Sequence, residues 1–583
     1  MLHRRKYLLL KQAKTKPDLA SILGVSASFL TKVLYKPGVS SHYHQFKIPK
    51  KSGGERIISA PSSELKDIQR RLSILLQDCR EVIHFDNKVS LDASVSHGFE
   101  RNLSIVTNAE IHRLKKNVLN LDLENFFESF NFGRVRGYFI SNKYFSLDPN
   151  IATVIAQIAC FNNSLPQGSP CSPVITNLIT NSLDIRLVHL ARKNGCAYSR
   201  YADDITFSTR KERFPNAILK DHDDLKLGSK LLGEIRRSGF AVNTIKTRLQ
   251  YRAVRQEVTG LSVNRKVNVP SDYWRTTRAM AHNLFTSGFF TIRESNGSIR
   301  PGTLNELEGR LTFIDSIDKY NNARKKSAPI GKYEYRKFNG LFAFRDKLNS
   351  REIVYSRFLH YKLFYANKFP TILTEGKTDN VYLKSALSEL QSYFPKLVNK
   401  KNGTSQYSPK LTFPNLNKKT MYFLDIGDGA TPFLRFLHRY ETEQKYFHGD
   451  KAASPVILIL DNDDGPKDLI KHVANKMKSC PNTVADVKKS GFLHLVSNLY
   501  LILTPLEKGQ DTMMEDLFFK KTLRVKLNGK SFTTESDFDE NKYYGKHLFS
   551  TKVVRSQKSS INFRKFKFIF NEIEKVIEHF KNL

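Results

Sequence analysis

Residues 199–208, SRYADDITFS, place two carboxylates next to each other in a run that is otherwise typical of β-strands. Ile205 and Phe207 favour a strand, and the residues after Asp204 alternate with period two. The sequence therefore predicts a hairpin with Asp203 and Asp204 at its tip. Adjacent carboxylates repel each other, and such a pair becomes tolerable when divalent cations lie between them.

The chain carries far more positive than negative charge. Its 94 Lys and Arg residues against 56 Asp and Glu residues give a formal net charge of +38. Because basic and aromatic residues are spread through every segment, we expect a polyanionic partner, most simply nucleic acid, rather than a merely soluble surface. With 583 residues, 40% of them hydrophobic, the chain is too long for one domain and too apolar for a disordered protein. We expect three or more folded units.

Neither the cysteines nor the N-terminal residues indicate export. The five cysteines stand far apart and form no CxxC pair, so neither a zinc site nor a disulfide framework is indicated. The apolar run YLLL near the N-terminus is too short for a signal peptide or a membrane span. We expect a cytosolic protein without a membrane partner.

Local patterns divide the chain into alternating elements. Residues 17–35 predict two short helices that break at Gly24, and residues 46–60 predict a strand, a Gly-Gly turn and a second strand. From 270 to about 325 the pattern is mainly helical. The stretch 321–337 is charged and contains Pro and Gly, which indicates a boundary.

A third carboxylate joins the first two. Asp122 ends an apolar, strand-like run in VLNLDLENFF. Together with Asp203 and Asp204 it can hold two metal ions about 4 Å apart, as in-line displacement at phosphorus requires.

These motifs resemble a reverse transcriptase palm: YADD, an upstream strand ending in Asp, and LPQGSPCSP at 165–173. The resemblance implies a right-hand fold of fingers, palm and thumb that polymerises deoxynucleoside triphosphates on an RNA template with Mg²⁺. It also implies that Asp122 and Asp203 bridge two Mg²⁺ ions and that Asp204 supports them.

The same resemblance assigns further residues. Phe127 holds the steric-gate position that excludes a nucleotide 2′-OH, unless it is a core residue. Gln167 would lie under the incoming nucleotide, and Gly168 would let the backbone come close to it. Lys246 matches the lysine thought to protonate pyrophosphate, although a surface lysine is nearly as good an interpretation. Three basic residues match the fingers region that grips the triphosphate: Lys50, Lys51 and Arg56. The sequence does not show which of the three makes this contact.

Two signatures narrow the resemblance to bacterial retron reverse transcriptases. Asn108 and His112 give the form NAxxH, and Val258, Thr259 and Gly260 give VTG. We expect these residues to bind RNA or to be otherwise particular to that family. Alone, His112 would be a structural histidine and Gly260 a turn residue.

The resemblance implies that the enzyme copies a dedicated non-coding RNA (msr-msd) into DNA. The primer would be the 2′-OH of a guanosine within that RNA. The product is a branched, RNA-linked single-stranded DNA (msDNA). The thumb would grip an RNA stem. We see no ribonuclease H acid set, so a host ribonuclease H would remove template. The location implied is the bacterial cytoplasm, and a homo-oligomer is open.

A second acid cluster lies after residue 369. Glu375 closes the strand TILT, and Asp461 and Asp463 close the strand VILIL. Strand-end acids at the carboxyl edge of a parallel sheet are where α/β sites form. A Glu on one strand with DxD on another resembles the Toprim domain of topoisomerases, primases and OLD-type nucleases. There Glu375 would act as acid or base, DxD would bind Mg²⁺, and Asp379 would match a common Toprim acid.

Weaker parts of this resemblance complete the site. Glu515 would be another metal ligand, Lys546 a basic residue of the site, and 427–429, after MYFLDI, the turn of a middle strand. One or two Mg²⁺ ions are expected. A nuclease acting on tRNA, other RNA or DNA fits best; an inert scaffold, a calcium site and a topoisomerase fit less well.

The resulting prediction is a multidomain protein of α/β and α+β class, in which a right-hand polymerase precedes a Toprim domain with a parallel sheet. Its Toprim nuclease would serve antiphage defence, restrained by the msDNA complex. Two alternative interpretations stay open: a Toprim region that only binds or assembles, and a general group II intron-like reverse transcriptase.

The predicted boundaries are 1–269 for fingers and palm (with a helical region at 1–45), 270–325 for the thumb, 326–368 for a linker or connector and 369–583 for the Toprim domain.

Overall fold

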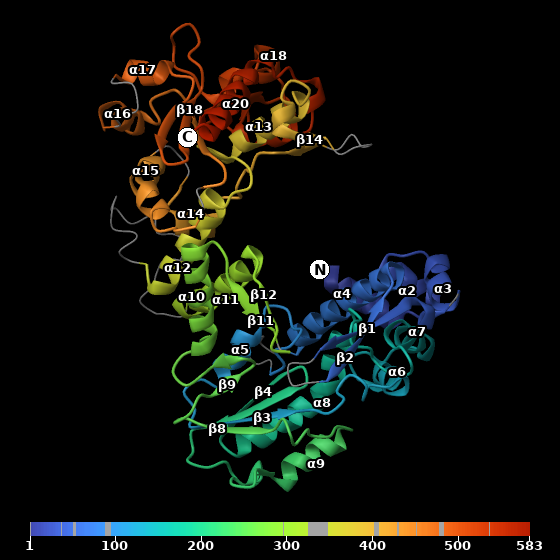
Figure 1. The fold of residues 1–583 in the computed structure, drawn as a ribbon. Coiled ribbons are helices and arrows are strands. Elements are labelled where there is room, and N and C mark those ends of the chain that lie inside the picture. Colours follow the sequence, from blue (N-terminus) through green and yellow to red (C-terminus); the bar gives the residue numbers. More distant parts are fainter. Residues whose placement is uncertain are drawn as a thin grey trace. The chain divides into compact units, whose positions relative to one another are not determined.

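The computed structural model divides into two compact units, Met1–Ser271 and Asp272–Leu583 (Figure 1). The structure describes residues 2–36, 38–49, 54–87, 95–294, 296–323, 348–400, 407–427, 431–449, 452–476, 483–535 and 537–583. Lys50 and Lys51, residues 428–429 and most of the predicted linker lie outside these ranges.

The N-terminal unit begins with three helices: α1 (Leu2–Gln12), α2 (Lys16–Leu23) and α3 (Ala27–Tyr35). Thr15 and Asp18 form a capping box at the start of α2, and Gly24 ends it with φ +70°. The predicted break at Gly24 is confirmed. The predicted hairpin is also present, as the antiparallel pair β1 (Tyr43–Pro49) and β2 (Glu55–Pro61).

A four-stranded antiparallel sheet forms the centre of this unit, in the order β4-β5-β3-β8. Its strands are β3 (Asn117–Asp122), β4 (Cys196–Tyr201), β5 (Asp204–Thr209) and β8 (Arg248–Tyr251). The surrounding helices are α4 (Ser63–Asp86), α5 (Ile105–Ile111), α6 (Phe132–Ser141), α7 (Pro149–Ala159), α8 (Ser172–Lys193) and α9 (Ser229–Arg237). Leu119, Leu121, Ile205 and Phe207 join these helices in one core. Two short hairpins complete the unit: β6 (Leu219–Asp221) with β7 (Lys226–Leu227), and β9 (Glu257–Val258) with β10 (Leu261–Ser262).

The second unit opens with α10 (Ser271–Ser287), the hairpin β11 (Thr291–Arg293) and β12 (Ile299–Pro301), and α11 (Leu304–Ala323). Its sheet has the order β13-β16-β18-β17, where β13 (Thr371–Thr374), β16 (Val456–Leu460) and β18 (Leu499–Leu503) are parallel and β17 (Leu493–Val496) is antiparallel. The other main helices are α12 (Ser350–His360), α13 (Lys377–Glu389), α14 (Lys418–Leu424), α15 (Thr431–Gln444), α16 (Lys467–Lys476), α17 (Val484–Lys489), α19 (Lys546–Leu548) and α20 (Lys567–Lys581).

The two faces of this sheet belong to different cores. Leu458 and Leu460 face a core that includes residues of α10, α11, α12 and α15, whereas Ile457 and Ile459 face a core that includes α13 and α20. Alternation along β16 therefore buries both faces, which explains its continuous apolar run.

Two sequence predictions are corrected here. MYFLDI, expected to contain a strand, lies largely in helix α14, which Asn417 caps by accepting from the backbone N–H groups of Lys419 and Thr420. A buried apolar run of this length does not distinguish a strand from a helix. Part of the predicted linker is instead the core helix α12 with the π-helical turn Tyr361–Tyr365, whose Phe358 and Phe364 are fully buried.

Within the part of the chain that the structure describes, no single helix is both long and apolar enough to cross a membrane. Helices α2 and α3 reach that length and composition only as a pair, and they are bent by 108°.

The backbone at Gly98 leaves no room for a side chain. A Cβ there would stand 2.6 Å from the backbone nitrogen of Ala202, whereas a Cβ at Gly137 in α6 would meet nothing within 4 Å. Gly98→Ala should therefore lower stability by about 1–3 kcal/mol. Gly137→Ala should be neutral or stabilising by about 0.5–1 kcal/mol. Thermal melting followed by circular dichroism compares the two, and equal midpoints would contradict the packing at Gly98.

Candidate active sites

Three carboxylates from distant segments meet at one end of the N-terminal sheet. Strands β4 and β5 form the predicted hairpin, in which Tyr201 pairs with Asp204 and Ala202 adopts φ +57° in the turn. Asp122 lies directly opposite Asp204 in the β3–β5 register. The backbone N–H of Leu123 donates to the carbonyl of Asp203 at 3.1 Å, so the turn is fixed to the end of β3.

The crowding of these acids changes their protonation. Desolvation, together with the charges of Asp203 and Asp122, raises the pKa of Asp204 to about 7, although the side chain keeps contact with solvent. Desolvation and Asp122 also raise the pKa of Asp203, while Lys246 and Arg56 oppose the shift. Lys246 Nζ lies 3.0 Å from each carboxylate oxygen of Asp122. Basic side chains thus compensate part of the negative charge.

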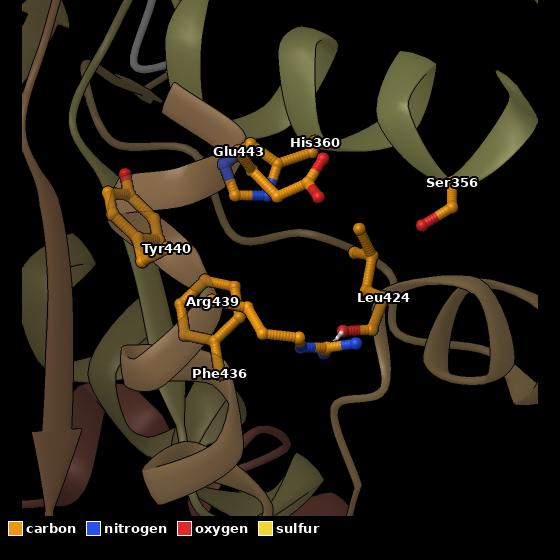
Figure 2. A pocket seen from close by; sticks show the side chains of 7 residues that line it. All are labelled: Ser356, His360, Leu424, Phe436, Arg439, Tyr440 and Glu443. Atoms are coloured by element: carbon orange, nitrogen blue, oxygen red, sulfur yellow. Dashed lines mark hydrogen bonds between the residues drawn. The ribbon is translucent and has the colours of Figure 1, made fainter. Parts of the chain in front are cut away.

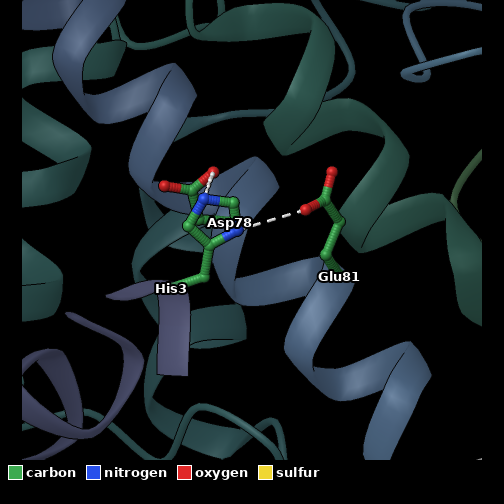
Figure 3. A group of neighbouring side chains, drawn as sticks. All are labelled: His3, Asp78 and Glu81. Carbon is green, nitrogen blue, oxygen red and sulfur yellow. Dashed lines mark ion pairs between the residues drawn. The ribbon is translucent and has the colours of Figure 1, made fainter. Parts of the chain in front are cut away.

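Among the described residues, one set of three side chains has possible metal-ligand atoms within 4.8 Å of one another. This set lies outside both carboxylate clusters. Figure 3 shows this set, His3, Asp78 and Glu81. Arg101 Nη1 donates to both carboxylates at 2.8 Å, so one guanidinium already bridges them. We interpret the set as a surface ion-pair network. The acids of the candidate sites stand farther apart, and a shared ion would draw their side chains together.

The predicted steric-gate residue has a buried neighbour. Phe126 stacks on Phe240 in the core, with 5.7 Å between ring centroids. Phe127 meets Phe126 edge-on at 5.6 Å and is only partly buried. Part of the Phe127 ring therefore remains available to a ligand.

The loop at 165–173 packs against the β1–β2 hairpin. The carbonyl of Gln167 accepts from the backbone N–H of Ser59 at 2.8 Å. Gly168 has φ +128°, and a Cβ there would stand 2.5 Å from the carbonyl oxygen of Ser59. Arg56, on the same strand as Ser59, is exposed and lowers the pKa of Asp203 by its charge. The loop and the strand that carries Arg56 are thus held together beside the carboxylates.

The NAxxH residues point into the protein. His112 contacts Ser199 Oγ and Ser208 Oγ, each at 2.7 Å, and Ser199 donates to Asn108 Oδ1 at 2.7 Å. His112 is fully buried, and burial lowers its pKa to about 3. Both motif side chains are too buried to touch RNA, so that part of the prediction is wrong for Asn108 and His112. They instead attach α5 to the two strands of the aspartate hairpin.

The VTG residues meet the same helix. Thr259 and Gly260, both with positive φ, make the two-residue turn between β9 and β10, and Val258 is buried. Thr259 Oγ1 donates to the carbonyl of Ile105 at 3.1 Å, at the first residue of α5. The two signatures, distant in sequence, therefore converge on one helix.

Sequence reasoning missed the residues that support the hairpin from within. Arg200 is fully buried and is held by Asp184 and Asn177 of α8. The available signal was that Arg200 is the single charged residue of the strand Cys196–Tyr201.

The second acid cluster forms at the carboxyl edge of the parallel sheet. Glu375 follows β13 and Asp461 follows β16, and these strands are parallel neighbours. A Cβ at Gly465 would lie 2.9 Å from Asp463 Oδ1 and 3.5 Å from Glu375 Oε1, so these acids border the same glycine turn.

The other predicted residues join this cluster. Asp379 accepts from the backbone N–H of Gly376 at 2.8 Å and caps α13. Glu515 is buried and accepts from Lys546 Nζ at 3.0 Å and from the Tyr382 hydroxyl at 3.2 Å. The backbone N–H next to Glu515, that of Met514, donates to Asp461 Oδ1 at 2.8 Å. All six side chains predicted for this site thus lie in one neighbourhood.

These carboxylates are desolvated and mutually repelling. Burial raises the pKa of Asp461 to about 8, with contributions from Asp379 and Glu515, and burial raises the pKa of Asp379 to about 7. Burial followed by Asp463 raises the pKa of Glu375, whose Oε2 is buried without a hydrogen-bond partner. Oxygen ligands with unmet charge are what hard divalent cations bind, so the residues present fit Mg²⁺.

A separate pocket lies between α12, α14 and α15 (Figure 2). Its polar groups are engaged in packing: Arg439 donates to the carbonyl of Leu424 at 3.0 Å, and Ser356 donates to that of Phe423 at 2.6 Å. It shares no residue with either carboxylate cluster; its lining is Ser356, His360, Leu424, Phe436, Arg439, Tyr440 and Glu443.

Comparison with known proteins identifies relatives of the first part of the chain. Residues 48–268 match the family described as reverse transcriptase (RNA-dependent DNA polymerase). The chain is 34% identical over 293 residues to the retron Mx65 reverse transcriptase of Myxococcus xanthus, covering 46% of this chain and 62% of that one. It is 32% identical over 326 residues to the retron Mx162 enzyme of the same organism, covering 52% and 63%. The chain thus spans less than two thirds of these two relatives.

A third relative is matched over most of its length. The retron Ec86 reverse transcriptase of Escherichia coli is 30% identical over 310 residues, which cover 53% of this chain and 86% of that protein. A solved telomerase structure from Candida albicans aligns with a TM-score of 0.29 and 13% identity, over 54% of this chain and 60% of that one, a similarity too low to carry an argument. The chain belongs to the family of retron reverse transcriptases.

Proposed function

We propose that the N-terminal part of this chain is an RNA-directed DNA polymerase. It copies a structured non-coding RNA, primed from a guanosine 2′-OH, into branched RNA-linked msDNA. The observation that carries the proposal is the register that sets Asp122 opposite Asp204, beside Asp203, in a chain of the retron family. Family membership also favours a retron enzyme over a general group II intron-like one.

The three aspartates would hold Mg²⁺. When bound, Mg²⁺ would supply the positive charge that acidifies the primer hydroxyl and neutralises the leaving pyrophosphate. Lys246, 3.0 Å from Asp122, would give a proton to the pyrophosphate. Arg56 would bind the triphosphate, and the exposed part of Phe127 would exclude a ribonucleotide 2′-OH.

The thumb and the host complete the reaction in this proposal. Residues 270–325 would grip a stem of the cognate RNA, and a host ribonuclease H would remove copied template.

We propose further that the C-terminal acid cluster is a Toprim-like, Mg²⁺-dependent nuclease that acts in antiphage defence and is restrained by the msDNA complex. Support comes from Glu375 and Asp461 at neighbouring parallel strand ends, with Asp463 at the same turn. Glu375 would act at the scissile phosphate, and Asp379, Asp461, Asp463 and Glu515 would hold the ion. A region that only binds or assembles would not need carboxylates whose pKa values lie near neutrality.

The first prediction for the proposed functions concerns Asp203. Asp203→Asn should lower DNA synthesis about a thousandfold or more, because several kcal/mol of charge stabilisation is lost. RNA binding should stay unchanged, since the basic surface is intact. Sequencing of the copurified nucleic acid should find a short DNA joined 2′–5′ to one RNA with the wild type only. Asp224→Asn, at an exposed aspartate in the same unit, is the control; synthesis retained by Asp203→Asn would overturn the assignment.

The second prediction concerns pH. The raised pKa of Asp204 means that this carboxyl is protonated below about pH 7 and must lose a proton before it can bind a cation. The Mg²⁺ concentration for half-maximal DNA synthesis should therefore rise as pH falls, by about tenfold per unit below the pKa. Asp204→Asn should need more Mg²⁺ at every pH but show a flatter dependence. A wild-type requirement that is constant between pH 6 and pH 8 would contradict the proposed metal site.

The third prediction separates nuclease from binding module. Expression of the chain without its RNA should arrest cell growth, and Glu375→Gln should relieve the arrest because it removes a charge at the metal site. Glu389→Gln, at the end of α13 and paired with Lys558, should leave the arrest in place. If Glu375→Gln arrests growth as strongly as the wild type, the region acts by binding.

A further inference from the structure

Arg200 and Asp184 form an ion pair with almost no access to solvent. Arg200 Nε donates to Asp184 Oδ1 at 2.8 Å and Nη2 donates to Oδ2 at 2.7 Å; the side chains are 0% and 2% exposed. Burying two charges is expensive unless nearly every polar atom is satisfied. A hydrophobic pair of similar volume would serve packing equally well or better, so this pair calls for another explanation.

The remaining nitrogen of the guanidinium, Nη1, reaches the turn of the aspartate hairpin. Arg200 Nη1 donates to the carbonyl oxygen of Ala202 at 2.9 Å. Ala202 has φ +57°, a left-handed conformation that is unfavourable for an alanine. The next residues in the chain are Asp203 and Asp204. The guanidinium therefore fixes the unfavourable conformation on which the direction of both carboxylates depends.

Asn177 extends the support to a neighbouring segment. Its Oδ1 accepts from Arg200 Nη1 at 3.2 Å, and its Nδ2 donates to the carbonyl of Gly98 at 2.7 Å. Gly98 in turn lies against the backbone nitrogen of Ala202. The turn is thus held on two sides, and both supports originate in α8, which carries Asn177 and Asp184.

We propose that Arg200, held by Asp184, is a positioning residue that aims Asp203 and Asp204 at the reacting phosphate. This inference rests on the proposed polymerase function and adds a residue that does not touch substrate. Lysine cannot replace it, because one ammonium cannot match both oxygens of Asp184 and also reach Ala202 with fixed geometry. A displacement of about 1 Å at a reacting centre can lower a rate about a hundredfold.

The test compares two arginines in the same unit. Arg200→Lys should lower kcat of DNA synthesis about 30- to 100-fold with little change in KM for deoxynucleotide, and it should raise the Mg²⁺ requirement. Arg134→Lys is the matched control, since Arg134 donates to the carbonyls of Ser129 and Ser238 and not to the turn. It should lower the melting temperature without changing kcat or the Mg²⁺ requirement. Hydrogen exchange without added metal should accelerate over residues 201–205 in Arg200→Lys only.

A milder variant keeps the test decisive if Arg200→Lys does not fold. Tyr198 donates its hydroxyl to Asp184 Oδ1 at 2.7 Å, so Tyr198→Phe weakens the pair while preserving the ring. It should shift kcat and the Mg²⁺ requirement in the same direction, by a smaller factor. Unchanged kcat and Mg²⁺ requirement in the folded variants, with only a lower melting temperature, would overturn the proposal. Wild-type synthesis that does not depend on Asp203 would instead overturn the polymerase function itself.

Discussion

The polymerase-like site depends on the antiparallel register between β3 and β5. In that register Asp122 stands opposite Asp204, and the hairpin turn brings Asp203 to the same end of the sheet. A shift by one residue would turn every side chain of a strand to the other face. It would remove Leu119 and Leu121 from the core and carry Asp122 away from its partners. The hydrophobic core and the chemistry are therefore specified by the same pairing.

Carboxylates this close together repel one another and destabilise the fold. In both acid clusters a lysine offsets part of this repulsion. Lys246 contacts Asp122 in the first site, and Lys546 contacts Glu515 in the second. In both places several carboxyl pKa values are nevertheless raised, so the charge is only partly compensated. Incomplete compensation is the property a cation site needs, since a fully paired set of carboxylates has nothing left to offer an ion.

The parts of the fold predicted well from sequence are those encoded locally. The hairpin at Asp203, the helix break at Gly24 and the acids at the ends of buried strands each follow from a few adjacent residues. The predictions that were wrong concern residues whose positions depend on contacts distant in sequence. NAxxH gave no sign that Asn108 and His112 face Ser199 and Ser208 rather than RNA, because only the packing of α5 on the hairpin decides that.

Arg200 is a second residue whose surroundings could not be predicted from its sequence neighbours. Its neighbours in sequence do not indicate its partners, because α8 supplies the Asp184 and Asn177 side chains that make full burial possible. The apolar run at MYFLDI was misassigned for a related reason: burial on all sides removes the periodicity that separates helix from strand. Sequence pattern reports exposure to water, so it is least informative where water is excluded.

Within the second unit, the region predicted as a thumb and the C-terminal sheet are not independent. Phe285 of α10 contacts Tyr361 and Phe447, and the same core continues to Leu458 and Leu460 of β16. That strand ends at Asp461. Because close-packed cores transmit strain rather than absorb it, a nucleic acid held by α10 and α11 would act on a body that includes this strand. If msDNA restrains the nuclease as proposed, that restraint would need no mobile linker between α10 and the sheet, because Phe285 and the strand that ends at Asp461 already share one core.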